Sequence, residues 1–322
     1  MEYPHNSHPL KYRRRTAQQA EASEKRRMAP FMVAMKALHD ANVPDAMTPE
    51  ELEKQRKNQE IMGKLVAPMG GLEWVPFDLG HIPAAWMRQQ DRMGNRRAIL
   101  YCHGGGYTSG NLGYSRILAS KLCRDTGLDV LAFEYRLAPE FHFPAPLEDA
   151  QAVWDYMMDL GYKAEDVIVV GDSAGGNLAL ILSLALKRAG RPLPGALLLF
   201  SPWTDLLLCG DSLEANADID PVLSPEYVRA ARDAYLGGHD PHDPLLSPLM
   251  GDFRDFPPTL IQVGTHEILY SDAVRLEERM KAAGVTCRLE VWEDMWHVFQ
   301  MFPNKKAADA IRNATHFLLA QL

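Results

Sequence analysis

The chain has 322 residues, of which 47% are hydrophobic and 24% are charged, a composition typical of an ordinary folded globular protein. Its formal net charge of −8 and the lack of a basic face argue against a nucleic-acid-binding protein. No apolar stretch is long enough to span a bilayer, and the N-terminus lacks the apolar core of a signal peptide. We therefore expect a cytoplasmic protein without a membrane span.

Residues 1–70 are predicted to form an N-terminal helical cap segment, because they are charged and rich in helix-forming residues. Thr48, followed by a proline, has the pattern of a helix start, with a capping residue before proline at the first helical position. Met28, Met32 and Met35 recur at near-helical spacing, which is usual for core filling. We also keep the hypothesis that these methionines wall a pocket at the edge of the following domain.

Residues 71–322 alternate short apolar runs with helical segments, which predicts an α/β domain with a mostly parallel sheet and helices on both faces. The first two runs, 72–79 and 82–88, are predicted to form an antiparallel pair. Four of the next six runs are almost continuously apolar, as strands covered on both faces require. These six predicted strands lie within 97–106, 128–139, 166–173, 195–203, 258–264 and 286–292. The predicted helices are 115–125, 146–160, 174–189, 271–283 and 305–322.

The stretch 205–246 interrupts this alternation. It follows one of the apolar runs, and it is rich in Asp, Pro and Gly. We predict that it is a second cap insertion over the rim of the sheet.

The four cysteines form no C-x-x-C pair and show no zinc-like spacing. They are Cys102, Cys123, Cys209 and Cys287. In a cytosolic chain such residues are expected to be reduced and to pack as small buried hydrophobes. We therefore predict four free thiols.

Ser173 stands where an apolar run, 167–171, turns into a helix, within the pattern Gly171-x-Ser173-x-Gly175. This pattern is typical of a nucleophile elbow, a tight strand-to-helix turn that lifts the serine above the edge of the sheet. The two glycines leave room for the turn because neither carries a Cβ. The pattern also occurs by chance, and serine is a common helix cap. Other motifs must decide between these readings.

A second glycine-rich motif, His103-Gly104-Gly105-Gly106, follows another apolar run. Serine chemistry needs a base, a carboxylate that orients the base, and N–H donors for the developing oxyanion. Consecutive glycines let backbone N–H groups approach a substrate closely, and the N–H of Ala174 is the expected partner donor. A phosphate-binding loop is the alternative, but the run lacks the Lys-Ser/Thr pair of a P-loop and the G-x-G-x-x-G spacing of a dinucleotide site.

Between and after these two motifs lie the stretches YRLAPE, FPAPLEDA, SPWTDL, DPVLS, VGTHEIL and MWHVF. In this order, over Trp74 to Phe299, the chain resembles the hormone-sensitive-lipase-like family of α/β-hydrolase esterases. The resemblance implies an α/β-hydrolase fold with a helical cap and the hydrolysis of short-to-medium acyl esters without a cofactor. It also implies Gly105, Gly106 and Ala174 as oxyanion-hole donors, and a possible homodimer.

Two other functions stay open. One is a non-catalytic small-molecule receptor of the same fold, as occurs in this family with a broken catalytic triad; here serine, acid and histidine are all present. The other is a serine peptidase, although peptidases of this architecture usually carry a large extra domain.

His297 is the expected base among the eleven histidines. In the implied fold the base lies on a loop after the last strand, and only His297 stands there. A histidine that follows two nearby tryptophans is more often a packed core residue, but the two glycine motifs favour catalysis. His266 precedes the expected acid and is predicted to point elsewhere, and His103 is predicted to hold the shape of the glycine loop.

The catalytic acid is Glu267 or Asp272, both of which follow the predicted strand 258–264. In the family the acid usually stands in Asp-Pro-Leu, and Glu267-Ile268-Leu269 keeps the leucine two residues after the acid. Asp272 instead begins the next helix, where it is placed to cap it. We predict Glu267 as the acid and keep Asp272 as the alternative. Asp172, beside the serine, is predicted to face away from it and to tether loops.

Overall fold

The computed structural model describes residues 33–34, 36–37, 48–65, 70–90 and 96–321, with side chains omitted for 58–65. Met28, Met32 and Met35, which the resemblance to esterases leads us to expect in the wall of a pocket for the acyl group, lie outside the described residues.

A single eight-stranded sheet forms the centre of the protein, in the order β1-β2-β4-β3-β5-β6-β7-β8. The strands are β1 (Leu72–Leu79), β2 (Ile82–Gln89), β3 (Ala98–Cys102), β4 (Asp129–Phe133), β5 (Val167–Asp172), β6 (Ala196–Phe200), β7 (Thr259–Gly264) and β8 (Cys287–Trp292). β2 is antiparallel to both β1 and β4, and all other pairs are parallel. Both the antiparallel opening pair and the mostly parallel sheet predicted from the sequence are confirmed.

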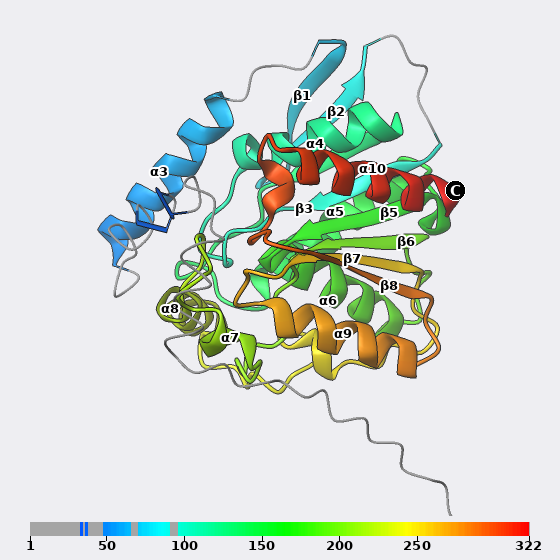
Figure 1. Ribbon diagram of the computed structural model, residues 1–322. Coiled ribbons are helices and arrows are strands. Elements are labelled where there is room, and N and C mark those ends of the chain that lie inside the picture. The colour runs from blue at the N-terminus through cyan, green and yellow to red at the C-terminus, as the bar shows by residue number, and fades with distance from the viewer. Residues whose placement is uncertain (1–32, 35, 38–47, 66–69, 91–95, 322) are drawn as a thin grey trace, which may run out of the picture.

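Helices cover both faces of the sheet (Figure 1). They are α4 (Leu112–Thr126), α5 (Ala145–Asp159), α6 (Ala174–Arg188), α9 (Tyr270–Ala282) and α10 (Lys305–Ala320). α4 and α10 pack on one face, and α5, α6 and α9 pack on the other. Within β5, Ile168 and Val170 face the first group, whereas Val167 and Val169 face the second. Because alternate side chains point to opposite faces, a strand buried on both sides must be apolar throughout.

The helix α3 (Pro49–Leu65) begins with the predicted cap, since the N–H of Glu51 donates to Thr48 Oγ1 at 3.3 Å. Two neighbouring side chains of α3 form hydrogen bonds with later parts of the chain. Arg56 makes two 2.8 Å contacts with the Glu140 carboxylate and donates to the Thr108 carbonyl at 2.9 Å. Gln55 Nε2 donates to the Tyr227 hydroxyl at 3.1 Å.

The segment 205–246 carries α7 (Ser212–Ala215) and α8 (Pro225–Leu236). In Figure 1, α3, α7 and α8 lie on the same side of the molecule, beyond one end of the sheet. The short 3-10 helices η1 (Ala164–Asp166), η2 (Pro248–Met250) and η3 (Phe299–Met301) complete the fold.

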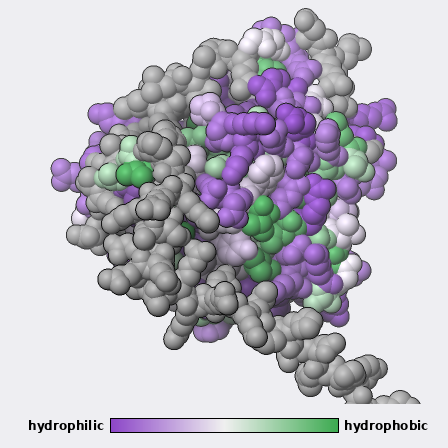
Figure 2. Space-filling view, in the orientation of Figure 1, coloured by the Kyte–Doolittle hydropathy of each residue, from purple (hydrophilic) through white to green (hydrophobic). Residues whose placement is uncertain are grey.

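The surface shown in Figure 2 is mainly hydrophilic where the structure describes it, with hydrophobic residues in small groups. No helix in the described ranges combines the length and the apolar character needed to cross a bilayer.

Candidate active site

The turn at Ser173, between β5 and α6, is a strained elbow. Ser173 has φ 55° and ψ −121°, a conformation that residues with a Cβ rarely adopt. A Cβ on Gly171 would lie 2.1 Å from the carbonyl oxygen of Gly175, and a Cβ on Gly175 would lie 2.1 Å from that of Cys102. The turn therefore requires both glycines, and it presents the serine at the carboxyl end of β5.

The glycine loop, residues 103–110, follows β3 and bends at Gly105, where φ is 118°. A Cβ on Gly105 would lie 2.3 Å from the carbonyl oxygen of Ser109. The Gly105 carbonyl accepts hydrogen bonds from the N–H groups of Thr108 at 3.1 Å and Ser109 at 3.0 Å. These hydrogen bonds close the loop into a turn. At Gly105 the backbone has a conformation that a residue with a side chain adopts only with strain.

The backbone N–H groups of Gly105, Gly106 and Ala174, which are the oxyanion donors expected from the sequence, have no acceptor in the part of the chain that the structure describes. Ala174 is the first residue of α6, where an N–H has no acceptor within the helix. Gly106 lies against α8, because a Cβ there would be 3.0 Å from the Tyr227 hydroxyl and 3.2 Å from Ala231. These three groups are available to donate to a developing oxyanion.

Asp172 joins the elbow to the glycine loop. It is fully buried, and its carboxylate accepts hydrogen bonds from the Tyr101 hydroxyl, from the Gly104 N–H at 3.0 Å and from the Tyr114 hydroxyl at 2.6 Å. Burial raises the pKa of Asp172, although these hydrogen bonds act in the opposite direction. Its partners lie in β3, the glycine loop and α4, so Asp172 is the loop tether that the sequence predicted.

His103 shapes the glycine loop, as predicted. Its ring stacks on Tyr135 with the centroids 4.1 Å apart, and its Nδ1 lies 2.8 Å from the Gly104 carbonyl oxygen. The Tyr135 hydroxyl donates to the His103 carbonyl at 2.8 Å. Burial lowers the pKa of His103 to about 4, so the ring is neutral near pH 7.

Glu267 and His297 meet on the loops that follow β7 and β8. His297 Nδ1 lies 3.2 Å from Glu267 Oε2, and both side chains are buried. The other carboxylate oxygen, Oε1, accepts hydrogen bonds from Ser201 Oγ at 2.9 Å and from the Gly264 N–H at 2.5 Å. We assign the Nδ1 proton from this contact, which leaves Nε2 of neutral His297 as the basic atom. Nε2 is buried and has no hydrogen-bond partner among the described residues.

The end of β6 holds these parts together. The Ser173 N–H donates to the Phe200 carbonyl at 2.9 Å, and the Val298 N–H donates to Ser201 Oγ at 3.0 Å. Ser201, which also donates to Glu267, therefore connects the elbow, the acid and the histidine loop. No role was assigned to Ser201 from the sequence. The signals there are its position directly after an apolar strand and its place at the start of the stretch SPWTDL.

The charge around His297 favours its protonated form. Burial lowers the pKa of His297, but the hydrogen bond and charge of Glu267 outweigh burial, together with the charges of Asp220 and Asp172. The net result is a pKa raised above the ordinary value of histidine. This is the electrostatic setting of a base that must become an imidazolium during a reaction.

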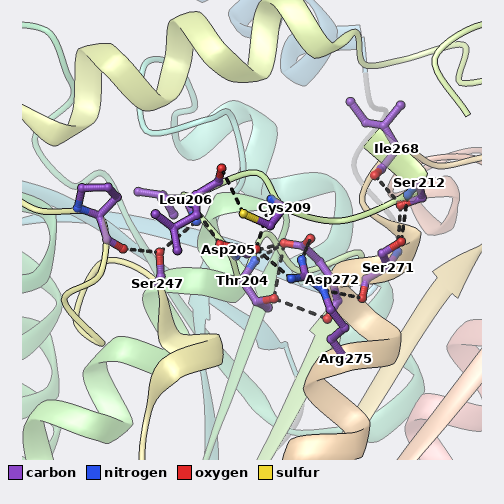
Figure 3. Close-up of polar contacts among 12 residues, drawn as sticks. Thr204, Asp205, Leu206, Cys209, Ser212, Ser247, Ile268, Ser271, Asp272 and Arg275 are labelled. Carbon is purple, nitrogen blue, oxygen red and sulfur yellow. Dashed lines mark hydrogen bonds and ion pairs between the residues drawn. The ribbon is translucent and has the colours of Figure 1, made fainter. Parts of the chain in front are cut away.

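Asp272, the alternative acid, belongs to a different cluster (Figure 3). Its Oδ2 accepts the N–H groups of Thr204 at 2.7 Å and Asp205 at 3.0 Å, and its Oδ1 pairs with Arg275 at 3.0 Å. The prediction that Asp272 caps its helix is wrong. It is the third residue of α9, whose start has no side-chain cap, and its carboxylate instead binds the backbone that follows β6. Burial raises the pKa of Asp272 to about 6.

All four cysteines are free, but only Cys102, Cys123 and Cys287 are buried. Cys209 is exposed, so the prediction of burial is wrong for it. It lies in the loop between β6 and α7, where its N–H binds Asp205 and its side chain faces solvent. No group of three or more potential metal-ligating side chains lies together in the described ranges.

Known proteins similar to this chain are esterases. The α/β-hydrolase fold family matches residues 99–301. An acetyl-hydrolase of Streptomyces hygroscopicus is 40% identical over 244 residues, which cover 76% of this chain and 80% of that protein. An esterase of Acinetobacter venetianus is 40% identical over 205 residues, covering 63% of this chain and 68% of that protein.

Solved structures show the same similarity over most of the chain. An esterase from the bacterial hormone-sensitive lipase family has a TM-score of 0.83 and 36% identity, covering 91% of this chain and 98% of that one. A hormone-sensitive lipase from a metagenome library has a TM-score of 0.84 and 34% identity, covering 90% and 97%. The resemblance seen in the sequence motifs is confirmed: this chain belongs to the α/β-hydrolase family and, within it, to the hormone-sensitive-lipase-like esterases.

Proposed function

We propose that this esterase hydrolyses short-to-medium acyl esters through an acyl-enzyme intermediate on Ser173. The observation that carries the proposal is the Glu267–His297 hydrogen bond at 3.2 Å, anchored through Ser201 to the strand end that also holds Ser173. The acetyl-hydrolase of Streptomyces hygroscopicus supports a short acyl group.

In the proposed reaction His297 Nε2 takes the proton of Ser173 as the hydroxyl oxygen attacks the ester carbonyl carbon. Glu267 holds the Nδ1–H tautomer and stabilises the imidazolium that forms. The N–H groups of Gly105, Gly106 and Ala174 donate to the oxyanion. His297 then gives its proton to the leaving alcohol, and the same steps with water release the acid and restore Ser173.

Residues 1–70 and 205–246 are proposed to be the cap over this site, and 71–322 otherwise the catalytic domain. The contacts of Tyr227 and Ala231 with Gly106, and of Arg56 with the Thr108 carbonyl, support this division. Removing residues 1–40 tests it. We expect a change in acyl-chain preference larger than the change in folding stability, and unchanged kinetics across an acyl series would contradict the cap proposal.

The decisive experiment measures turnover of p-nitrophenyl acetate, butyrate and decanoate and of a peptide anilide. We expect ester turnover that is strongest for the shorter chains, and little turnover of the anilide. Ser173→Ala should lower ester turnover by about 10⁴-fold or more. Preferred cleavage of the anilide would indicate a peptidase, and binding of esters without any turnover would indicate a receptor.

Ser183→Ala is the matched control. Ser183 is a fully buried serine of α6 whose hydroxyl donates to the Ala179 carbonyl at 2.9 Å. This variant removes a buried hydroxyl from the helix that follows Ser173, and we expect it to leave ester turnover unchanged. Mass spectrometry after treatment with an organophosphate should show one adduct, on Ser173. The homodimer and the cytoplasmic location stay predictions, for which sedimentation and cell fractionation are the tests.

A further inference from the structure

The turn 216–220 of the insertion holds the loop that carries Glu267. Asn216 Nδ2 donates to the carbonyl oxygen of Glu267 at 2.8 Å and to that of Thr265 at 3.2 Å. Asp220 Oδ2 accepts the N–H of Ile268 at 2.9 Å. The peptide unit that joins Glu267 to Ile268 is therefore held from both sides, its carbonyl by an amide and its N–H by a carboxylate.

The same loop is held one turn further on by Ser212, at the start of α7. The Ser212 hydroxyl donates to the Ile268 carbonyl at 2.6 Å and accepts the Ser271 N–H at 2.8 Å (Figure 3). These contacts give the backbone around Glu267 little freedom to move. A loop that is held in this way keeps the Glu267 carboxylate at a constant distance from the His297 imidazole.

Asp220 itself is completely buried. Its Oδ1 accepts the N–H groups of Val222 at 2.9 Å and Leu223 at 3.0 Å, so three backbone amides surround one carboxylate. On the outer side of the turn, Lys36 Nζ donates to the carbonyls of Ala217 at 3.1 Å and Asp220 at 3.3 Å. Asp220 thus connects the insertion, the N-terminal segment and the acid loop.

Three carboxylates act on the charge of His297, each from a different element. Glu267 is bonded to it from the loop after β7, Asp220 acts from the insertion and Asp172 from the end of β5. Asp172 is surrounded by two tyrosine hydroxyls and a backbone amide and already has a structural function. Asp220 faces the acid loop itself, so its position serves both the orientation of Glu267 and the charge on His297.

We propose that the turn 216–220 positions the catalytic acid, and that Asp220 is its charged member, which orients the Glu267 loop through the Ile268 N–H and stabilises the imidazolium of His297 by its charge. This inference rests on the proposed function, because it treats Glu267 and His297 as acid and base. Asp220 touches neither the substrate nor the reacting atoms.

The matched pair of variants is Asp220→Asn and Asp272→Asn. Both residues are buried carboxylates that accept backbone N–H bonds, and burial raises the pKa of each to about 6. Of the two, Asp220 is the one that is bonded to the Glu267 loop and whose charge raises the pKa of His297, whereas Asp272 is bonded to the backbone of Thr204 and Asp205. The first readout is the pKa of the His297 imidazole, measured by NMR on histidine-labelled protein and assigned with His297→Gln. This readout does not depend on turnover.

Removal of the Asp220 charge takes away an interaction that favours protonated His297. We expect Asp220→Asn to lower the His297 pKa by about half a unit to one unit, and Asp272→Asn to leave it unchanged. With p-nitrophenyl butyrate, kcat of Asp220→Asn should fall roughly 10- to 100-fold with little change in KM. The acid limb of its pH profile should move to lower pH.

Asn216→Ala tests the loop contacts without removing a charge. We expect a lower kcat with an unchanged His297 pKa, a result that a loss of charge does not produce. An equal His297 pKa in Asp220→Asn and Asp272→Asn overturns the proposed charge, and a wild-type kcat in Asn216→Ala overturns the positioning role of the turn. If Ser173→Ala keeps full ester turnover, the proposed function has failed, and the NMR titration still decides the part played by Asp220.

Discussion

Two buried histidines follow the carboxyl ends of two parallel strands, β3 and β8, and carry opposite electrostatics. His103 follows β3 and is bonded to a backbone carbonyl, and burial lowers its pKa to about 4. His297 follows β8 and is about as buried, yet its pKa is raised because Glu267 is its partner and Asp220 and Asp172 add negative charge. Burial alone therefore does not decide the charge of a histidine. The two histidines differ in the group that lies against Nδ1, which is a neutral carbonyl for His103 and a carboxylate for His297.

The difference separates the candidate site into two parts. Around His103 the fold uses neutral contacts, with aromatic stacking and backbone hydrogen bonds that give the glycine loop its shape. Around His297 it uses buried carboxylates that stabilise a positive charge. In the proposed reaction the part around His103 keeps its shape, while His297 in the other part gains and loses a proton. The following experiments test this division.

The largest expected effect breaks the contact that distinguishes the two histidines. Glu267→Gln keeps the shape of the side chain but no longer stabilises the Nδ1–H tautomer of His297. We expect ester turnover to fall by about 10⁴-fold with folding largely intact. Steady-state kinetics and thermal unfolding measure the two quantities. Near-normal turnover of this variant beside a folded, inactive Asp272→Asn would reverse the assignment of the acid.

A smaller loss is expected from the neutral part. Gly105→Ala places a Cβ 2.3 Å from the Ser109 carbonyl oxygen and must displace the loop. We expect turnover to fall on the order of 100- to 1000-fold, the usual cost of losing an oxyanion donor. Gly190→Ala is the control, because Gly190 also has a positive φ but its added Cβ meets nothing within 4 Å. Equal losses in both variants would show that backbone strain alone is responsible.

Because His103 is neutral in the folded protein, we expect its titration to affect the free energy of unfolding and not ester turnover. In the unfolded chain His103 takes up a proton near pH 6.5, whereas in the folded protein it does so only near pH 4. Stability is therefore lost as the pH falls through this window. Between pH 7 and pH 5 the free energy of unfolding of the wild type should fall by about 2 kcal/mol relative to His103→Gln. Urea unfolding at both pH values measures it, and a constant difference between the two proteins would contradict the buried, neutral state.

The smallest effect concerns the thiols and does not alter activity. Cys102 lies at the end of β3, immediately before the glycine loop, and is buried, whereas Cys209 is exposed on the insertion. Alkylation of the native protein should modify one thiol, Cys209, and alkylation after denaturation should modify all four. Mass spectrometry counts them. Reaction of Cys102 in the native protein would show that the region before the glycine loop opens readily.

The features that local sequence predicts are those with local causes. Gly171 and Gly175 are required by a turn that they themselves form, and β5 is apolar because both of its faces are covered. The roles of Ser201 and Asp220 depend instead on partners far along the chain, 66 residues away for Ser201 and Glu267 and 48 for Asp220 and Ile268. The spacing of residues along the sequence does not reveal contacts between such distant positions.

The error at Asp272 has the same origin. An acidic residue in the first turn of a helix is a good candidate for a cap when only its neighbours are considered. In the fold, the N–H groups of Thr204 and Asp205, 68 and 67 residues away in the chain, reach the carboxylate instead. Local preference was overruled by a contact that exists only once β6 and β7 are paired.

The contacts of Gln55 in α3, and of Lys36 before it, have a consequence for the order in which the parts of the protein assemble. Gln55 pairs with Tyr227, which lies 172 residues later, and Lys36 pairs with Ala217, which lies 181 residues later. At a synthesis rate of about 5–20 residues per second, Lys36 and Gln55 wait on the order of 10 to 30 s until these partners have been synthesised. The partners of Arg56, which are Thr108 and Glu140, are synthesised much earlier, so α3 can bind this part of the chain before the insertion is complete. The contacts of Lys36 and Gln55 with the insertion are therefore among the later ones to form, although both residues precede the sheet in the chain.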